Sequence, residues 1–268
     1  MIKRLGRVLK LLREICFIDV HCHIEDELFN EDRDSVLKRA KDSNVCAVIS
    51  SALSFDDASF LLNFSNKYPR FVFVSLGWDP ADLSIIKLFD EYCNFVKEHK
   101  NEIVGLGEVG LDFYYIRENV LRETQIKLFR RWIQFSKDLN LPLIVHSRSA
   151  GKYAVKILME EDAERVVLHA YDGRPGWALK GVEHGYFFSI PTSVWHSIQK
   201  QKLVRLIPLD NMLLETDSPV LSPFKGRRNE PANIIYAARK IAEIKKITVE
   251  KVAEITTKNA LSLFNLSL

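Results

Sequence analysis

The sequence has few cysteines and no closely paired cysteine motif. Four cysteines occur in 268 residues, namely Cys16, Cys22, Cys46 and Cys93. None forms a Cys-x-x-Cys pair of the kind that marks a zinc ribbon or a redox motif. Three of them lie in or beside apolar runs, where a free thiol packs as a small hydrophobic group. The pattern excludes a disulfide-dense secreted scaffold and favours free thiols in a reducing, cytoplasmic location.

Long hydrophobic runs and a strong charge of one sign are also missing. In the first 14 residues Lys3, Arg4, Arg7 and Lys10 interrupt the apolar residues, which argues against a signal-peptide core or a membrane span. We expect residues 1–14 to form a basic amphipathic extension, and we expect no membrane partner. Thirty-eight Lys and Arg oppose 35 Asp and Glu. This balance does not by itself indicate nucleic-acid binding.

What the sequence does contain is a regular alternation of short apolar runs and longer amphipathic stretches. The eight apolar runs predict strands buried on both faces of a parallel sheet. They span residues 15–20, 45–50, 71–76, 103–107, 143–145, 166–168, 186–190 and 212–214. Helices are predicted between them, among others at 34–42, 83–100, 124–140 and 195–206. Eight such alternations predict a (β/α)₈ TIM barrel that forms a single domain over residues 15–268.

An open doubly wound sheet is the alternative architecture. Such a sheet usually carries a glycine-rich turn that opens a helix and binds a dinucleotide. Here Gly105, Gly107 and Gly110 bracket Glu108 instead of opening a helix. The barrel is therefore the favoured fold.

Side chains that bind metal ions follow five of the eight predicted strands. They are His21 and His23 after the first, Glu108 after the fourth, His146 after the fifth, His169 after the sixth and Asp217 after the eighth. The carboxyl ends of barrel strands meet at one face, where active sites lie. Residues two apart on a strand also point to the same side. We therefore expect these six side chains to converge on a metal centre.

Six ligands exceed what one tetrahedral ion with an open position requires and suit two neighbouring ions. The ligand types leave Zn²⁺, Mn²⁺, Co²⁺ and Mg²⁺ open. Asp19 and Glu215 precede ligands by two residues. Because ligand histidines usually donate their second N–H to a carboxylate, we expect both to orient histidines rather than bind metal.

Several ordered motifs resemble those of the TatD-type metal-dependent deoxyribonucleases, which have amidohydrolase-like barrels. They are FIDVHCH (17–23), GEVGLD (107–112), LPLIVHSR (141–148), VVLHAYDG (166–173), LLETDSP (213–219), RNEP (228–231) and TTKNALSLF (256–264). HSRSAG, DGRP and GYFFSIP look closest to the subgroup known as TatD DNase domain-containing protein 3. The resemblance implies one metal on His21, His23 and Asp217, a second on His146 and His169, and Glu108 as the bridge.

Two features depart from the family pattern. The usual Gly-x-His-Pro loop reads Gly77-Trp78-Asp79-Pro80 here. With Asp79 in place of the histidine, we expect altered substrate contact or proton transfer and an intact metal centre. The other departure is the extension before Phe17.

These observations predict a hydrolase that cleaves phosphodiester bonds with metal-activated water. Glu108 and Asp217 are the predicted catalytic residues, and Asp217 is the expected general base. Arg148 and Arg228 are candidate phosphate contacts, since guanidinium groups suit phosphate oxygens. Aromatic residues near the mouth, among them Trp78, Phe113, Tyr114, Tyr171 and Trp195, are candidates for stacking on unpaired bases. A recessed mouth favours single-stranded DNA ends and therefore an exonuclease. We expect it to act in the 3′–5′ direction and to be a monomer or weak homo-oligomer.

Two other classes stay open. An enzyme of the same superfamily that cleaves a small ester or amide, such as an aminoacyl-tRNA deacylase, would share the metals. Many such hydrolases bridge their metals with a carboxylated lysine, whereas the corresponding position here resembles Glu108, which favours a phosphoesterase. A catalytically silent binding scaffold is the third class. The presence of all six ligands argues against it.

Overall fold

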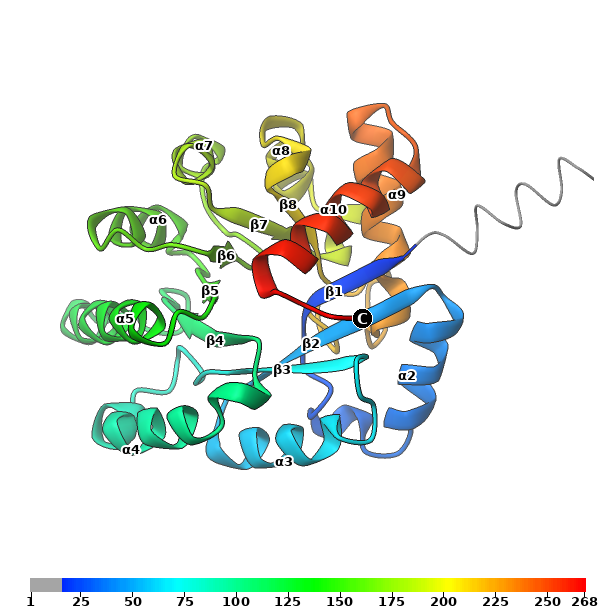
Figure 1. Ribbon diagram of the computed structural model, residues 1–268. Helices are drawn as coiled ribbons and strands as arrows, with labels where there is room; N and C mark the ends of the chain where they lie inside the picture. The colour runs from blue at the N-terminus through cyan, green and yellow to red at the C-terminus, as the bar shows by residue number, and fades with distance from the viewer. Residues whose placement is uncertain (1–15) are drawn as a thin grey trace, which may run out of the picture.

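The computed structural model describes residues 16–268, so the predicted extension at residues 1–14 lies outside the described part of the chain. Eight parallel strands form one sheet in the order β1 to β8, and helices surround it (Figure 1). The strands are β1 (Phe17–Cys22), β2 (Val45–Ala52), β3 (Val72–Leu76), β4 (Gly105–Gly110), β5 (Leu143–His146), β6 (Val166–Leu168), β7 (Phe187–Ile190) and β8 (Met212–Leu214). The predicted single-domain (β/α)₈ barrel is confirmed.

The helices follow the strands as the alternation predicts. They are α2 (Arg33–Asp42), α3 (Phe55–Ser65), α4 (Ile85–Glu98), α5 (Asn119–Leu139), α6 (Gly151–Glu160), α7 (Pro175–Glu183), α8 (Ile198–Leu206), α9 (Ile234–Lys245) and α10 (Val249–Phe264). Polar residues set several starts: the side chain of Ser54 accepts a hydrogen bond from the Asp57 amide, and that of Ser197 accepts one from the Lys200 amide. Such caps satisfy amides that have no partner inside the helix. Ser197 explains why α8 begins later than predicted.

Strand β4 shows how neighbours override local preference. The apolar pattern predicts a strand at 103–107, but β4 runs to Gly110 and contains three glycines. Glycine weakens an isolated strand. Here β4 pairs with β3 on one side and β5 on the other, so tertiary pairing determines its extent.

Helix α10 covers one end of the barrel (Figure 1). Its Leu263 and Phe264 pack with residues from the barrel interior, including Ile18, Val20 and Leu213. The hydroxyl of Thr257 donates to the carbonyl of Cys16, which directly precedes β1. Helix α10 therefore closes the amino ends of the strands, and the opposite end, where the strands terminate, is left for the site.

Strands β1 and β8 meet through hydrogen bonds around the metal-ligand positions. The Asp217 amide donates to the His21 carbonyl at 3.0 Å. The buried carboxylate of Asp19 accepts from the Thr216 amide at 2.9 Å and from its hydroxyl at 2.5 Å. Burial raises the pKa of Asp19 to about 7, although these hydrogen bonds act to lower it. Asp19 thus joins the first and last strands.

The four cysteines divide into two kinds. Cys22 and Cys93 are buried free thiols, as expected. Cys16 and Cys46 form a disulfide with their Cα atoms 5.7 Å apart. The expectation of four free thiols is therefore wrong for this pair, because the parallel pairing of β1 with β2 brings together two residues that are 30 positions apart.

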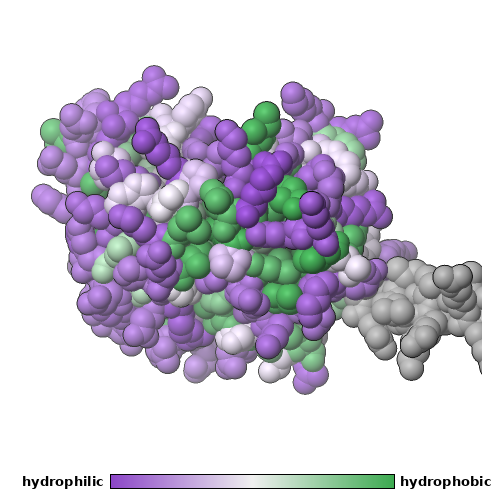
Figure 2. All heavy atoms as spheres, turned by 90° about the horizontal axis from the view of Figure 1, so that it is seen from above, coloured by the Kyte–Doolittle hydropathy of each residue, from purple (hydrophilic) through white to green (hydrophobic). Residues whose placement is uncertain are grey.

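The side of the molecule seen in Figure 2 is mostly hydrophilic and has one central hydrophobic area. Exposed apolar atoms are common on folded proteins, so this area alone indicates no function. Within residues 16–268, no helix combines the length and hydropathy needed to cross a bilayer.

Candidate metal centre

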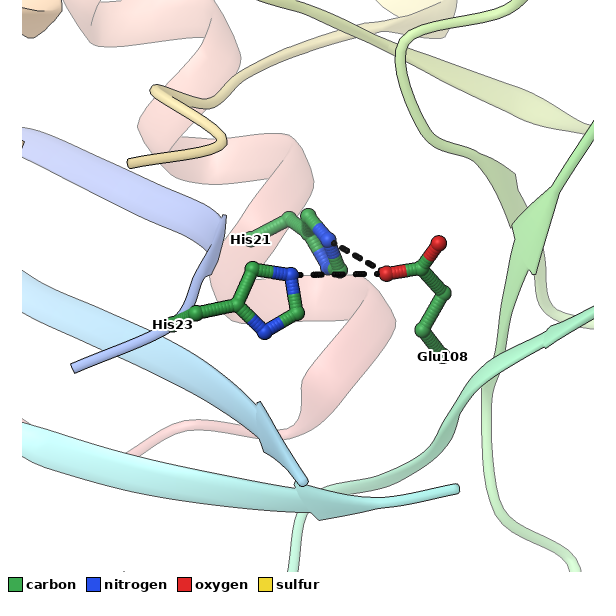
Figure 3. A group of neighbouring side chains, drawn as sticks. All are labelled: His21, His23 and Glu108. Carbon is green, nitrogen blue, oxygen red and sulfur yellow. Dashed lines mark ion pairs between the residues drawn. The ribbon is translucent and has the colours of Figure 1, made fainter. Parts of the chain in front are cut away.

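The six predicted ligands lie together, and Glu108 is at their centre. Its Oε2 lies 3.2 Å from His21 Nε2 and 3.4 Å from His23 Nε2 (Figure 3). Its Oε1 contacts His146 Nδ1 and lies 3.0 Å from His169 Nε2. One carboxylate oxygen thus faces His21 near the end of β1 and His23 directly after that strand, and the other faces the histidines that end β5 and follow β6.

Asp217 completes the group from the loop after β8. Its Oδ1 lies 3.5 Å from His21 Nε2 and 3.7 Å from His23 Nε2. Three sets of ligand atoms each fall within 4.8 Å of one another. These sets are His21, His23 and Glu108; His21, His169 and Asp217; and Glu108, His146 and His169.

The donor set fits divalent metal ions. The Nε2 atom of His21 is buried and makes no hydrogen bond, although it faces oxygens of Glu108 and Asp217. A buried nitrogen without a partner is costly unless another group satisfies it. Imidazole nitrogens and carboxylate oxygens that converge in this way are the usual ligands of divalent transition metals.

The backbone around the site leaves no room for larger residues. A Cβ atom at Gly77 would lie 2.3 Å from the Glu108 carbonyl oxygen. At Gly110, where φ is +144°, a Cβ would lie 2.2 Å from the His146 carbonyl oxygen. Asp217 itself has a φ of 54°, in the left-handed region. Such conformations occur at functional sites, where the surrounding structure holds them in place.

Other acidic residues orient the histidines, and they differ from the expected ones. His23 Nδ1 lies 2.9 Å from Glu25 Oε1, and His146 Nε2 lies 3.0 Å from Asp112 Oδ2. Both contacts match the usual pattern of a carboxylate behind a ligand histidine. Glu25 follows His23 by two residues, and Asp112 ends the GEVGLD motif. These two positions in the sequence were signals that Glu25 and Asp112 could orient ligand histidines, but the sequence analysis predicted neither residue.

The two carboxylates expected in that role have other partners. Asp19 contacts the backbone amide of His21 at 3.4 Å, not its imidazole, because Thr216 holds its oxygens. Glu215 Oε2 lies 3.9 Å from His169 Nδ1, too far for a hydrogen bond. Glu215 instead accepts from the Ala170 amide at 2.7 Å. It therefore supports the backbone next to the ligand.

The charges of the site are strongly coupled. Burial opposes ionisation of Glu108, but the positive charges of His169 and His146 outweigh it and hold its pKa well below the usual range. Burial also opposes ionisation of Asp217, but its contact with His21 and the charge of that residue lower its pKa to about 2. Both carboxylates are therefore ionised at neutral pH.

The site opens into a cavity of about 620 Å³. His23, Glu108, His146, His169 and Asp217 line it. Arg148, a candidate phosphate contact, also lines it, and its guanidinium lies 4.0 Å from the centre of the Tyr114 ring. Tyr114 is 46% exposed, so an aromatic surface beside a cation is accessible near the mouth.

Several predicted substrate contacts lie elsewhere. Tyr171 is fully buried and its hydroxyl donates to the Arg174 carbonyl at 3.3 Å, so it does not reach the cavity. Arg228 forms an ion pair with Asp32 at 2.7 Å and does not line the cavity. Asp79 is half-buried, does not line it either, and accepts a hydrogen bond from the Ala81 amide.

The aromatic residues predicted near the mouth differ in their exposure to solvent. Trp78 and Phe113 are buried, whereas Tyr114 and Trp195 are partly exposed. Lys200, which the sequence pattern does not predict as a site residue, lines the cavity from α8. Its place between two glutamines in an amphipathic stretch gave no signal in the sequence.

Comparison with known proteins agrees with this geometry. The family model described as TatD related DNase matches residues 18–265. The chain belongs to the TatD-related DNase family. It is 44% identical over 257 residues to human "Deoxyribonuclease TATDN3", with 92% of this chain and 94% of the relative covered. The mouse "Putative deoxyribonuclease TATDN3" is also 44% identical, with 92% and 87% covered.

More distant relatives share the fold and a metal-dependent hydrolase description. An uncharacterized metal-dependent hydrolase of Methanocaldococcus jannaschii is 34% identical, with 94% of this chain and 98% of the relative covered. Among solved structures, the TatD homologue YJJV of Escherichia coli aligns with a TM-score of 0.81 at 25% identity, with 94% of this chain and all of that chain covered. This member of the TatD-related DNase family is thus a metal-dependent hydrolase.

Proposed function

We propose that this chain hydrolyses phosphodiester bonds at single-stranded DNA ends, in the 3′–5′ direction, with two divalent metal ions. The observation that carries the proposal is the position of Glu108, whose two oxygens face different pairs of histidines. A carboxylate with this arrangement suits a bridge between two ions. The family and its DNase-named relatives support a DNA substrate.

The resemblance to the TatD family implies the ligand roles. His21, His23 and Asp217 would hold one ion, and His146 and His169 the other; Asp217 Oδ1 lies 3.5 Å from His21 Nε2 and 3.7 Å from His23 Nε2, which suits the first group. When bound, such ions would polarise a phosphoryl oxygen and lower the pKa of a water molecule, so that it could attack the phosphorus atom. Zn²⁺, Mn²⁺, Co²⁺ and Mg²⁺ are all compatible with these donors.

Asp217 is the proposed general base. It lines the cavity, so a water molecule beside it has access to its carboxylate. Its pKa of about 2 keeps it ionised at neutral pH, the form that a general base requires. Proton transfer by a positioned carboxylate typically contributes about 100- to 10,000-fold to a rate.

The cavity is better suited to bind the end of a DNA strand than a continuous duplex. It is recessed among the loops that follow the strands, and Arg148 provides a cation at its wall. Tyr114 beside Arg148 offers a ring on which an unpaired base can stack. A strand end can enter such a recess, whereas an intact helix would have to open first.

A nuclease assay tests the proposal. Single-stranded DNA labelled at its 5′ end should be shortened stepwise from the 3′ end in the presence of a divalent ion, faster than a blunt duplex. Glu108→Gln should reduce kcat by more than about 100-fold, because even the loss of partners behind metal ligands costs about 10- to 100-fold. The exposed Glu164→Gln is the control and should leave the rate unchanged. Full activity of Glu108→Gln would exclude the bridging role.

Two further readouts separate the alternatives. Elemental analysis should find two ions per wild-type chain, and a single ion would exclude the binuclear centre. Hydrolysis of a D-aminoacyl-tRNA without any cleavage of DNA would instead identify an ester hydrolase of the same superfamily.

A further inference from the structure

Lys200 is a buried cation at the wall of the cavity. It lies on α8 and is 9% exposed. Its Nζ donates hydrogen bonds to the carbonyl oxygens of Ala170, at 2.5 Å, and Tyr171, at 2.8 Å. Both carbonyls belong to the segment that directly follows the metal ligand His169. The ammonium group is thus fixed beside the metal centre.

Lys200 lacks an anionic partner. Within residues 16–268, no carboxylate oxygen lies within 4.0 Å of its Nζ. An ammonium group has three N–H donors, and the two carbonyls use two of them. A buried charge without a counter-ion is costly, and proteins usually pair such groups. The remaining donor and the unpaired charge indicate an anionic ligand.

The cavity supplies few other cations for such a ligand. Arg148 and Lys200 are the only lysine or arginine side chains among its described lining residues, and the acidic groups there include Glu25, Asp57 and Asp172. Burial lowers the pKa of Lys200, while the charges of Asp172, Glu215 and Asp217 act in the opposite direction. A negatively charged substrate therefore meets few favourable charges from the protein itself.

We propose that Lys200 binds a non-bridging oxygen of the substrate's phosphoryl group and thereby makes the cavity selective for phosphate esters. This inference rests on the proposed function, because it assigns a phosphate contact to the same cavity. Lys200 and Arg148 then hold the anion from two walls of the cavity, and the metal centre lies at its base. The contact needs both the charge of Lys200 and its position against the two carbonyls.

A structural role alone would predict a different pattern of variants. If Lys200 served only to hold the Ala170 and Tyr171 carbonyls, Lys200→Gln would be tolerated, since an amide still donates hydrogen bonds. If the charge binds phosphate, Lys200→Gln fails and Lys200→Arg restores function. Lys202→Gln, on an exposed position of the same helix, is the matched control.

Binding of inorganic phosphate to the Mn²⁺-loaded protein, measured by calorimetry, provides the first test. We expect Lys200→Gln to weaken binding by about 10- to 100-fold, the usual effect of losing a hydrogen bond between charged groups. Lys200→Arg should bind within a few-fold of wild type, and Lys202→Gln should match it. Thermal unfolding of each variant checks that the fold is retained. Equal binding by wild type and Lys200→Gln, or no binding by wild type, would overturn the inference.

Steady-state cleavage of a single-stranded oligonucleotide provides the second test. Lys200→Gln should raise KM more than it lowers kcat, because the contact already exists in the bound substrate. Should wild type cleave no DNA while its phosphate binding still depends on Lys200, the proposed DNA substrate fails and the phosphate contact stands. Should DNA cleavage persist with an unchanged KM in Lys200→Gln, the contact fails and the nuclease stands.

Discussion

Metal binding should release more protons from this site than from one built of ordinary histidines. In the metal-free protein, burial lowers the pKa of His21, but its close contacts with the carboxylates of Asp217 and Glu108 outweigh burial and raise that pKa to about 9. Burial likewise opposes protonation of His146, but the charge of Glu108 raises its pKa to about 10. The imidazole nitrogens of these residues therefore carry protons that must be released before the nitrogens can bind a metal ion.

The expected number of protons follows from these values. At about pH 8, a histidine with the usual pKa is only about 3% protonated, so four ordinary histidines would release about 0.1 proton. His21 and His146 are at least about 90% protonated at that pH and together release about two protons. His23, whose pKa is also raised well above its usual value, adds to this number. His169 adds none, because burial and the charge of His21 lower its pKa to about 4.

Calorimetric titration of Mn²⁺ into the metal-free protein measures this release. The observed enthalpy at about pH 8, in two buffers with different ionisation enthalpies, gives the number of protons transferred. His146→Asn should reduce the release by about one proton. Substitution of His184, which is exposed and lies outside the site, should leave it unchanged.

A total release of one proton or fewer would refute this reasoning. Ionisation of a water molecule in the site contributes at most one proton, so a value between two and four requires protonated histidines. The same small value in wild type and His146→Asn would show that the carboxylates do not raise the pKa of these histidines in the metal-free state.

Two further predictions concern stability. Asp19→Ala removes two hydrogen bonds to Thr216 and leaves buried donors without a partner. The free energy of unfolding, measured by urea denaturation, should therefore fall by about 2 to 4 kcal/mol. A change below about 0.5 kcal/mol would exclude a role of Asp19 in closing the barrel. Because the folded pKa values of His21 and His146 lie above the unfolded value, their contribution to stability is complete below about pH 6.5 and is lost as pH rises through 9 to 10. The melting temperature of the metal-free protein should therefore fall between pH 7 and 10, and a constant or rising value would contradict the shifts.

The ligand residues were predictable because strand ends are local features. His21, His146 and Asp217 each follow a short apolar run, and parallel barrel strands end on one face. Apolar patterning locates the runs, and the chemistry of the side chains indicates a metal. The family motifs contain the same positions, so the two lines of reasoning agree on one ligand set.

The surroundings of the ligands were less predictable, since they depend on where the chain leaves each strand. Tyr171 lies two residues after His169, and strand alternation would turn both to one side. Strand β6 ends at Leu168, however, and Ala170 has a φ of 36°, so alternation no longer applies and the ring packs against Phe188 instead.

Long-range pairing determined several other outcomes. Arg228 points to Asp32, a residue 196 positions away, and this ion pair fixes its position outside the cavity. Lys200 reaches the cavity only because α8 packs beside the segment after β6. Neither contact can be predicted from the residues that neighbour Arg228 or Lys200 in the sequence.

The sequence by itself determined the barrel and the choice of six candidate ligands that meet at one end of it, because hydrophobic periodicity and side-chain chemistry can be read from short stretches of consecutive residues. The tertiary structure decided which acids support the histidines, which aromatic rings stay buried, and which cations reach the cavity. Those outcomes depend on contacts between segments far apart in the chain, whose geometry is set by the packing of the whole barrel.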